Sequence, residues 1–164
     1  MILQRSSELA IRAAFFLAHQ APGKLSPAHE IAAHAGVPEP YLAKILQRLS
    51  AAGLVRSFRG PGRGIKLARP ANTITLASLV LVMEGSDKAN VCVLGLPECS
   101  DATPCALHHE WIPIRGTICN LLEKTTLADL VESVAAREAV LGPRKVRRLP
   151  VPAKAEARRR RRRS

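Results

Sequence analysis

The stretch LAKILQRLSAAGLVRSFRGPGRGIKLARP, residues 42–70, decides the fold of this chain. Its first half predicts a helix over residues 39–52, because four apolar residues follow the i, i+3, i+4, i+7 spacing of one helix face. Gly53 is the expected residue just beyond that helix, where the left-handed backbone conformation favours glycine. The four apolar residues are Leu42, Ile45, Leu46 and Leu49.

The second half of this stretch predicts a β-hairpin. LVRSF (54–58) and GIKLA (64–68) are short strand-like segments, and the glycines of the RGPGRG sequence between them permit a tight turn. Two helices are expected earlier, one over residues 3–19 and a short one that begins at Ser26 as N-cap and ends at Gly36. Three helices followed by a hairpin indicate a winged helix-turn-helix.

The rest of the chain predicts further helices. Residues 74–83 are expected to form a helix that leads away from the hairpin. Residues 105–123 predict a longer helix with one apolar side, kinked or restarted at Pro113, which cannot donate a backbone hydrogen bond. A last helix is expected over 127–136, with Thr126 as its cap.

Charge is divided unevenly along the chain, whose net charge is +12. Residues 1–70 hold 10 basic and 3 acidic residues, residues 71–141 hold 4 and 9, and residues 142–164 hold 11 and 1. The basic front suits a phosphate-rich partner. No long uncharged apolar run and no signal peptide are visible, so we expect a cytoplasmic protein with no membrane partner.

The exposed face of helix 39–52 and the hairpin predict binding to double-stranded DNA. A recognition helix turns polar side chains toward base edges in the major groove. Residues 56–69 hold five basic residues and no acid, which favours an anionic partner, and the glycines allow close approach to phosphates or the minor groove. The expected DNA-binding residues are Tyr41, Lys44, Gln47 and Arg48 on the helix and Arg56, Arg59, Arg63 and Lys66 on the hairpin.

Three cysteines, Cys92, Cys99 and Cys105, lie on one polar loop with six and five residues between them. Thiolates suit iron–sulfur clusters, zinc or copper(I), and the Pro, Gly, Ser and Asp residues of the loop let the sulfurs converge. The spacing differs from the C-x2-C pattern of zinc fingers and ferredoxins, so it does not name the metal. His108 lies three residues beyond Cys105, whereas Cys119 lies among apolar helix residues and is interpreted as structural.

Together these regions resemble the Rrf2 family of bacterial regulators, the group that includes IscR, NsrR and RirA. The resemblance covers residues 1–136 and is carried by the 42–70 stretch, the following ITL and MEG, the three-cysteine loop and TTLADLV. It implies a homodimer in which helix 105–123 packs across the two-fold axis. It also implies that the dimer binds a palindromic operator and represses transcription. It also implies an iron–sulfur cluster, of the two-iron or four-iron type, on the three loop cysteines.

The resemblance leaves the fourth ligand of that cluster open. Relatives of the nitric-oxide-sensing type use an acidic residue near Glu8, donated by the partner subunit. The IscR type uses a histidine three residues beyond the last cysteine, which corresponds to His108. This chain carries both residues, and its first cysteine interval has six residues against five in IscR-type loops. Pro38 stands where the family usually has a capping serine.

The expected architecture is mainly α with a small β-hairpin wing. It comprises a winged helix-turn-helix DNA-binding domain at 1–84, a cysteine-rich cluster-binding loop at 85–104, a dimerisation helix and C-terminal helix at 105–141, and a disordered basic tail at 142–164.

The leading hypothesis is a repressor that senses nitric oxide, redox or iron status through the cluster. A metal-free thiol switch and a structural zinc site remain alternatives. An enzyme is not expected, because the chain has no phosphate-binding loop or nucleophile elbow, and a Cys–His pair on the loop lacks a third orienting group.

Overall fold

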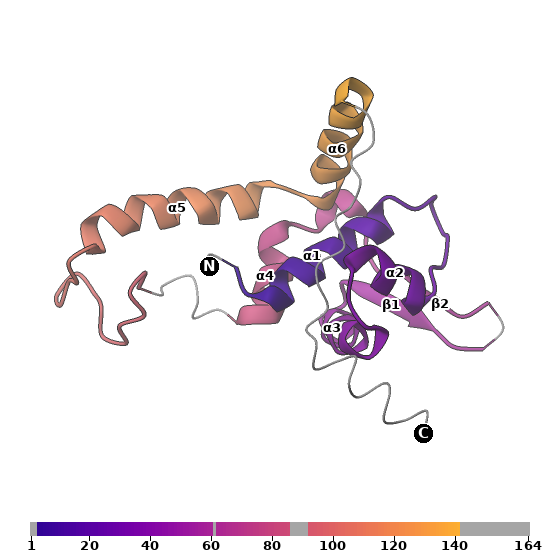
Figure 1. The fold of residues 1–164 in the computed structure, drawn as a ribbon, viewed down its shortest axis with the longest axis horizontal. Coiled ribbons are helices and arrows are strands. Elements are labelled where there is room, and N and C mark those ends of the chain that lie inside the picture. Colours follow the sequence, from indigo (N-terminus) through magenta and orange to yellow (C-terminus); the bar gives the residue numbers. More distant parts are fainter. Residues whose placement is uncertain (1–2, 61, 86–91, 142–164) are drawn as a thin grey trace.

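The computed structural model describes residues 3–60, 62–85 and 92–141, and Figure 1 shows their arrangement. Within these ranges the chain forms helices, one two-stranded hairpin and a short 3-10 turn, in the order expected for a winged helix-turn-helix. The basic tail expected at 142–164 lies outside the described residues. The elements are α1 (Arg5–Ala18), α2 (Ala28–Ala35), α3 (Glu39–Ala51), β1 (Val55–Phe58), β2 (Gly64–Leu67), η1 (Ala71–Thr73), α4 (Leu76–Glu84), α5 (His108–Lys124) and α6 (Leu127–Leu141).

One apolar core holds the first part of the chain together. Its side chains come from α1, α2, α3, the wing, α4 and the first turn of α6. The four apolar residues that predicted α3 are all buried, and Gly53 follows the helix with a φ of 68°, as expected. Burying four such side chains gives α3 most of its stability, because a helix of 13 residues is marginal by itself. The polar face of α3 is thereby fixed toward solvent.

The wing is an antiparallel hairpin in which Val55 pairs with Leu67 and Phe58 pairs with Gly64. It is anchored to the segment before α2, because Ser26 and Ile65 exchange two backbone hydrogen bonds of 3.0 and 2.9 Å. The predicted role of Ser26 as helix N-cap is therefore wrong. Pro27 occupies the N-cap position, and Ser26 instead forms a bridge to a strand that lies far away in the sequence.

Glu84, at the end of α4, connects this helix to α1. One of its carboxylate oxygens accepts hydrogen bonds from the backbone N–H of Gln4 at 2.7 Å and from the hydroxyl of Ser7 at 2.5 Å. Ser7 is fully buried, so this contact is shielded from water on one side. The last turn of α4 therefore holds a fixed position beside the N-terminal helix.

Helix α6 begins with the cap that the sequence predicted. The backbone N–H of Thr126 donates to Asp129 at 2.8 Å, and the backbone N–H of Asp129 donates to the hydroxyl of Thr126 at 3.2 Å. This reciprocal pair satisfies two of the backbone donors that a helix start leaves free. The helix continues to Leu141, five residues beyond its predicted end.

Helix α5 extends away from the rest of the fold (Figure 1). It begins at His108 rather than at the predicted residue 105, and it runs past Pro113 as one helix. Leu107, Ile114 and Leu121 on its expected apolar side are 45%, 52% and 63% exposed in the single chain. No helix within the described ranges has both the length and the apolar character needed to span a membrane.

Candidate cysteine centre and nucleic-acid interface

The structure brings the three loop cysteines together. The sulfur atoms of Cys92, Cys99 and Cys105 all lie within 4.8 Å of one another, and those of Cys92 and Cys105 are 3.5 Å apart. Cys92 is buried, whereas the other two are half-buried. The predicted convergence of three thiols on one loop is therefore present in a single chain.

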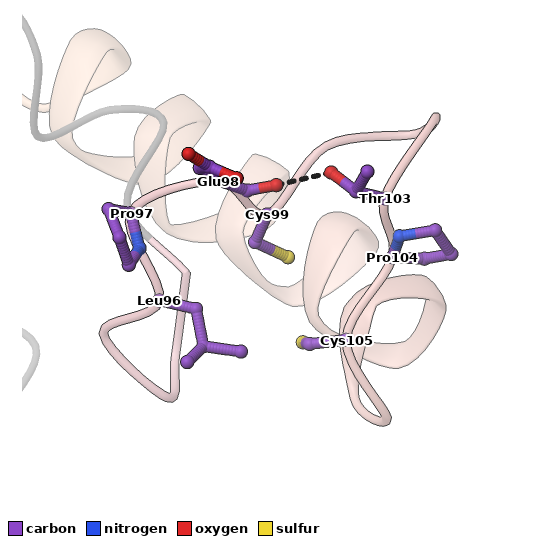
Figure 2. Close-up of a pocket in the computed structure, with 7 residues that line it drawn as sticks. All are labelled: Leu96, Pro97, Glu98, Cys99, Thr103, Pro104 and Cys105. Carbon is purple, nitrogen blue, oxygen red and sulfur yellow. Dashed lines mark hydrogen bonds between the residues drawn. The ribbon is translucent and has the colours of Figure 1, made fainter.

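A short turn between Cys99 and Cys105 produces this convergence. Ser100 and Thr103 exchange backbone hydrogen bonds of 3.3 and 3.1 Å, and the Thr103 hydroxyl also donates to the backbone carbonyl of Glu98. Serine and threonine suit this turn because their hydroxyls bond to nearby backbone groups. The turn reverses the chain, so that Cys99 and Cys105 lie on facing sides of one pocket, as Figure 2 shows.

The pocket beside Cys99 and Cys105 has room for a small inorganic group. Its volume of about 270 Å³ has room for a group of several atoms, since one water takes roughly 30 Å³. Leucine and proline side chains form much of its wall, and thiols supply the soft donors that iron–sulfur clusters and zinc require. The lining residues are Leu96, Pro97, Glu98, Cys99, Thr103, Pro104 and Cys105.

The thiols differ in how readily they ionise. Burial raises the pKa of Cys92, but hydrogen bonds from the backbone of Leu96 and Leu94 and from the neighbouring thiols lower it more, to about 7. A backbone hydrogen bond at Cys105 lowers the pKa of Cys99, yet burial and the other two thiols raise it more. Of Cys92 and Cys99, Cys92 therefore ionises more readily to the thiolate, the form in which cysteine binds metals.

His108 joins this centre from the first turn of α5. Its side chain is buried at 8% exposure, with Nδ1 at 3.1 Å from the sulfur of Cys99 and Nε2 at 2.9 Å from a carboxylate oxygen of Asp101. The hydrogen bond and charge of His108 hold the pKa of Asp101 below its usual value. Asp101 is thus a third group that orients the Cys99–His108 pair, and the sequence alone did not reveal it.

Glu8 is not brought to the thiols within the chain. It lies in the first turn of α1, where its carboxylate forms an ion pair of 3.1 Å with Arg5. The prediction for Glu8 concerns the partner subunit, so it stays a prediction. Cys119 lies half-buried on α5 and is not part of the three-thiol group.

A groove separates the exposed face of α3 from the wing. Its volume is about 400 Å³, and it is bordered by Lys44 and Gln47 from the helix and by Ser57 and Arg59 from the wing. The structure therefore brings three of the predicted DNA-binding residues to one groove. Tyr41 is also exposed, at 44%, one turn earlier on α3.

The wing also holds a cluster of side chains that the sequence did not predict. Arg56 and Lys66 are cross-strand partners, and both lie over the ring of Phe58, at 5.5 and 5.2 Å from its centroid. Among the described residues, no acid forms an ion pair with either cation or with Arg59 and Arg63. No local pattern reports this cluster, because Lys66 lies on the other strand, eight residues after Phe58.

Arg48 differs from the other residues of the α3 face. Its guanidinium donates to the backbone carbonyl of Val82 on α4, with Nη2 2.5 Å from the oxygen. The side chain is exposed on α3 but directed toward the end of α4 rather than toward the groove.

Comparisons with known proteins identify the family of the chain. Residues 3–133 match the family model Rrf2, described as "Iron-dependent Transcriptional regulator". IscR of Vibrio campbellii is 31% identical over 106 residues, which cover 65% of this chain and 62% of that relative.

Two solved structures share the fold. CymR of B. subtilis, the global cysteine regulator, has a TM-score of 0.68 and 27% identity, covering 80% of this chain and 96% of that one. IscR of T. potens has a TM-score of 0.66 and 28% identity, covering 87% and 93%. The resemblance inferred from the sequence and the winged-helix fold are confirmed, and the chain belongs to the Rrf2 family of DNA-binding transcriptional regulators.

Proposed function

We propose that this protein is a homodimeric repressor that binds operator DNA in the cytoplasm and senses nitric oxide, redox or iron status through an iron–sulfur cluster. The observation that carries the proposal is the group of three thiols within 4.8 Å of one another. Cys92, Cys99 and Cys105 would hold the cluster, with His108 or the partner subunit's Glu8 as the remaining ligand.

The loop residues have separate tasks in this function. When bound, the cluster supplies a redox-active and nitric-oxide-reactive iron centre. The low pKa of Cys92 favours a thiolate ligand at neutral pH, and the Ser100–Thr103 turn holds Cys99 opposite Cys105. Leu96, Pro97 and Pro104 form an apolar part of the pocket wall.

The exposed faces support the two macromolecular partners. Ile114 and Leu121 on α5, with Leu107 just before it, present exposed apolar side chains that a second copy of the chain would cover. The groove between α3 and the wing is bordered by Lys44, Gln47 and Arg59. DNA bases and phosphates would lie against these residues, with the wing cations beside them. A ligand at the cysteine loop can alter repression only if it favours one arrangement of these faces over another.

The test begins with anaerobic purification, a visible spectrum, and assays of iron and acid-labile sulfide. Operator duplexes are then selected from random DNA, and their affinity is measured with and without nitric oxide. We expect a brown protein whose affinity changes with nitric oxide, a response lost in Cys99→Ala and kept in Cys119→Ala. A colourless protein after reconstitution would refute the cluster and leave the DNA-binding proposal standing.

A metal-free thiol switch is the second candidate, because the sulfurs of Cys92 and Cys105 are only 3.5 Å apart. In this reaction both S–H bonds are lost and one S–S bond forms, while two electrons and two protons reduce diamide to the hydrazine. This candidate predicts a mobility change on a non-reducing gel that Cys105→Ala abolishes. Stoichiometric zinc in a colourless protein would instead support the structural zinc site.

A further inference from the structure

His108 lies in a continuous line of contacts from the surface to the thiol group. Asp101, whose side chain is 91% exposed, contacts Nε2 at 2.9 Å, and Nδ1 on the opposite side of the ring contacts the sulfur of Cys99 at 3.1 Å. The ring is nearly buried, and the ring of His109 meets it edge to face at 5.4 Å between centroids. The orientation of the imidazole is therefore fixed from several sides.

The carboxylate of Asp101 determines where a proton sits on this ring. An ionised carboxylate offers only acceptors, so the contact with Nε2 requires that Nε2 carry the hydrogen. This holds whatever the charge of the ring. Nδ1 is consequently the nitrogen that faces the sulfur, and its lone pair is directed at the thiol group whenever the ring is neutral.

The exposure of Asp101 argues for a role other than stability. An ion pair with one partner at the surface contributes little to folding, because water screens it. Histidine ligands of metals commonly donate their second N–H to a carboxylate, which fixes the ring and the nitrogen that binds. The Asp101–His108–Cys99 arrangement has this form, whereas Glu8 is occupied with Arg5 on α1.

We propose that Asp101 is a positioning residue that keeps the hydrogen of His108 on Nε2 and so makes Nδ1 the fourth ligand atom of the cluster. This inference rests on the proposed function, since it assigns the ligand that the three thiols leave open.

The first test uses the metal-free protein, so it does not depend on the cluster. Two-bond ¹H–¹⁵N spectra of histidine-labelled protein report which ring nitrogen carries the hydrogen, and His108→Ala identifies the signals of His108. We expect hydrogen on Nε2 in the wild type and a shift toward Nδ1 in Asp101→Asn. Glu110→Gln, which removes another exposed acid of the same region, serves as the control and leaves the signals unchanged. Hydrogen on Nδ1 alone in the wild type, or no change in Asp101→Asn, would overturn the proposal.

The second test uses the reconstituted, reduced protein. Pulsed EPR should detect coupling to a histidine nitrogen in the wild type and not in His108→Ala. In competition with a chelator, Asp101→Asn should hold iron about 10- to 100-fold more weakly than the wild type or Glu110→Gln. A cluster without nitrogen coupling, lost in Glu8→Gln but not in His108→Ala, would overturn this inference and leave the proposed function intact. Failure of the wild type to take up iron and sulfide would overturn both.

Discussion

Replacing Phe58 by leucine tests whether the wing binds DNA as a preformed cluster. The ring of Phe58 lies beneath Arg56 and Lys66, at 5.5 and 5.2 Å from the two charged groups. Leucine keeps an apolar side chain in the strand and changes no charge. The substitution therefore removes the restraint on two cations and leaves their number untouched.

The expected loss of affinity follows from two magnitudes. A cation over an aromatic ring at an exposed site gains about 0.5–1 kcal/mol. Ordering one long side chain during binding costs about 0.5–1.5 kcal/mol, a cost that the ring has already met in the free protein. The ordering that the ring imposes on each cation cannot exceed the energy of the cation–ring contact. The two contacts together therefore contribute about 1–2 kcal/mol to the free energy of binding. This corresponds to a loss of about 5- to 30-fold in operator affinity.

The assay is fluorescence anisotropy with a selected operator duplex at several salt concentrations. Phe58→Leu should weaken binding at every concentration while the slope of log affinity against log salt stays that of the wild type. Arg56→Gln, as the contrasting variant, should reduce that slope by about 0.9, because one phosphate contact fewer releases fewer counterions. Unchanged or tighter binding of Phe58→Leu, with the fold intact by circular dichroism, would refute the preformed cluster.

Three further predictions concern the fold. Thr126→Ala should lower the free energy of unfolding by about 1 kcal/mol, measured in urea, because the cap of α6 is lost. Hydrogen bonds from Thr126 lower the pKa of Asp129 in the folded protein. The stability that this carboxylate contributes should therefore be present above its ordinary pKa and be lost as the pH falls through the lowered value. A stability independent of pH below 5 would count against the capping pair. Gly64→Ala should lower the free energy of unfolding by about 1–3 kcal/mol, because its Cβ would lie 2.8 Å from that of Leu25. Wild-type stability in this variant would show that Leu25 can move away from β2. Leu121→Glu should convert dimers to monomers in sedimentation velocity runs, and a dimer that persists would place the interface elsewhere than α5.

Local sequence signals predicted the part of the fold that local physics determines. The apolar stripe of α3 and Gly53 follow from helix periodicity and from the backbone freedom of glycine, and the Thr126–Asp129 cap follows from side chains three residues apart. Ser26 was assigned wrongly because its partner, Ile65, lies 39 positions away and no local pattern reports such a pairing. Helix α5 begins at His108 rather than at residue 105, and the residues before it form a turn in which the backbone N–H of His108 donates to the carbonyl of Cys105 at 3.1 Å.

The candidate site divides in the same way. The polar composition of one loop predicted that its three cysteines converge, and the family resemblance indicated His108 as a candidate fourth ligand. Asp101 and Phe58 carried no periodicity and no motif, because each acts through a partner that only the folded chain supplies. Both were visible in the sequence as ordinary loop and strand residues.

The bond between Arg48 and Val82 has a consequence for how DNA and the end of α4 affect one another. The Arg48 guanidinium donates through Nη2 to the Val82 carbonyl at 2.5 Å, so turning this side chain outward to a base edge or phosphate would break the bond. If operator binding turns Arg48 outward, the last turn of α4 loses this bond to α3 but keeps the bonds of Glu84 to α1 and the packing of Met83 in the core. Operator binding would then weaken the attachment of the last turn of α4, from which the chain continues to the cysteine loop.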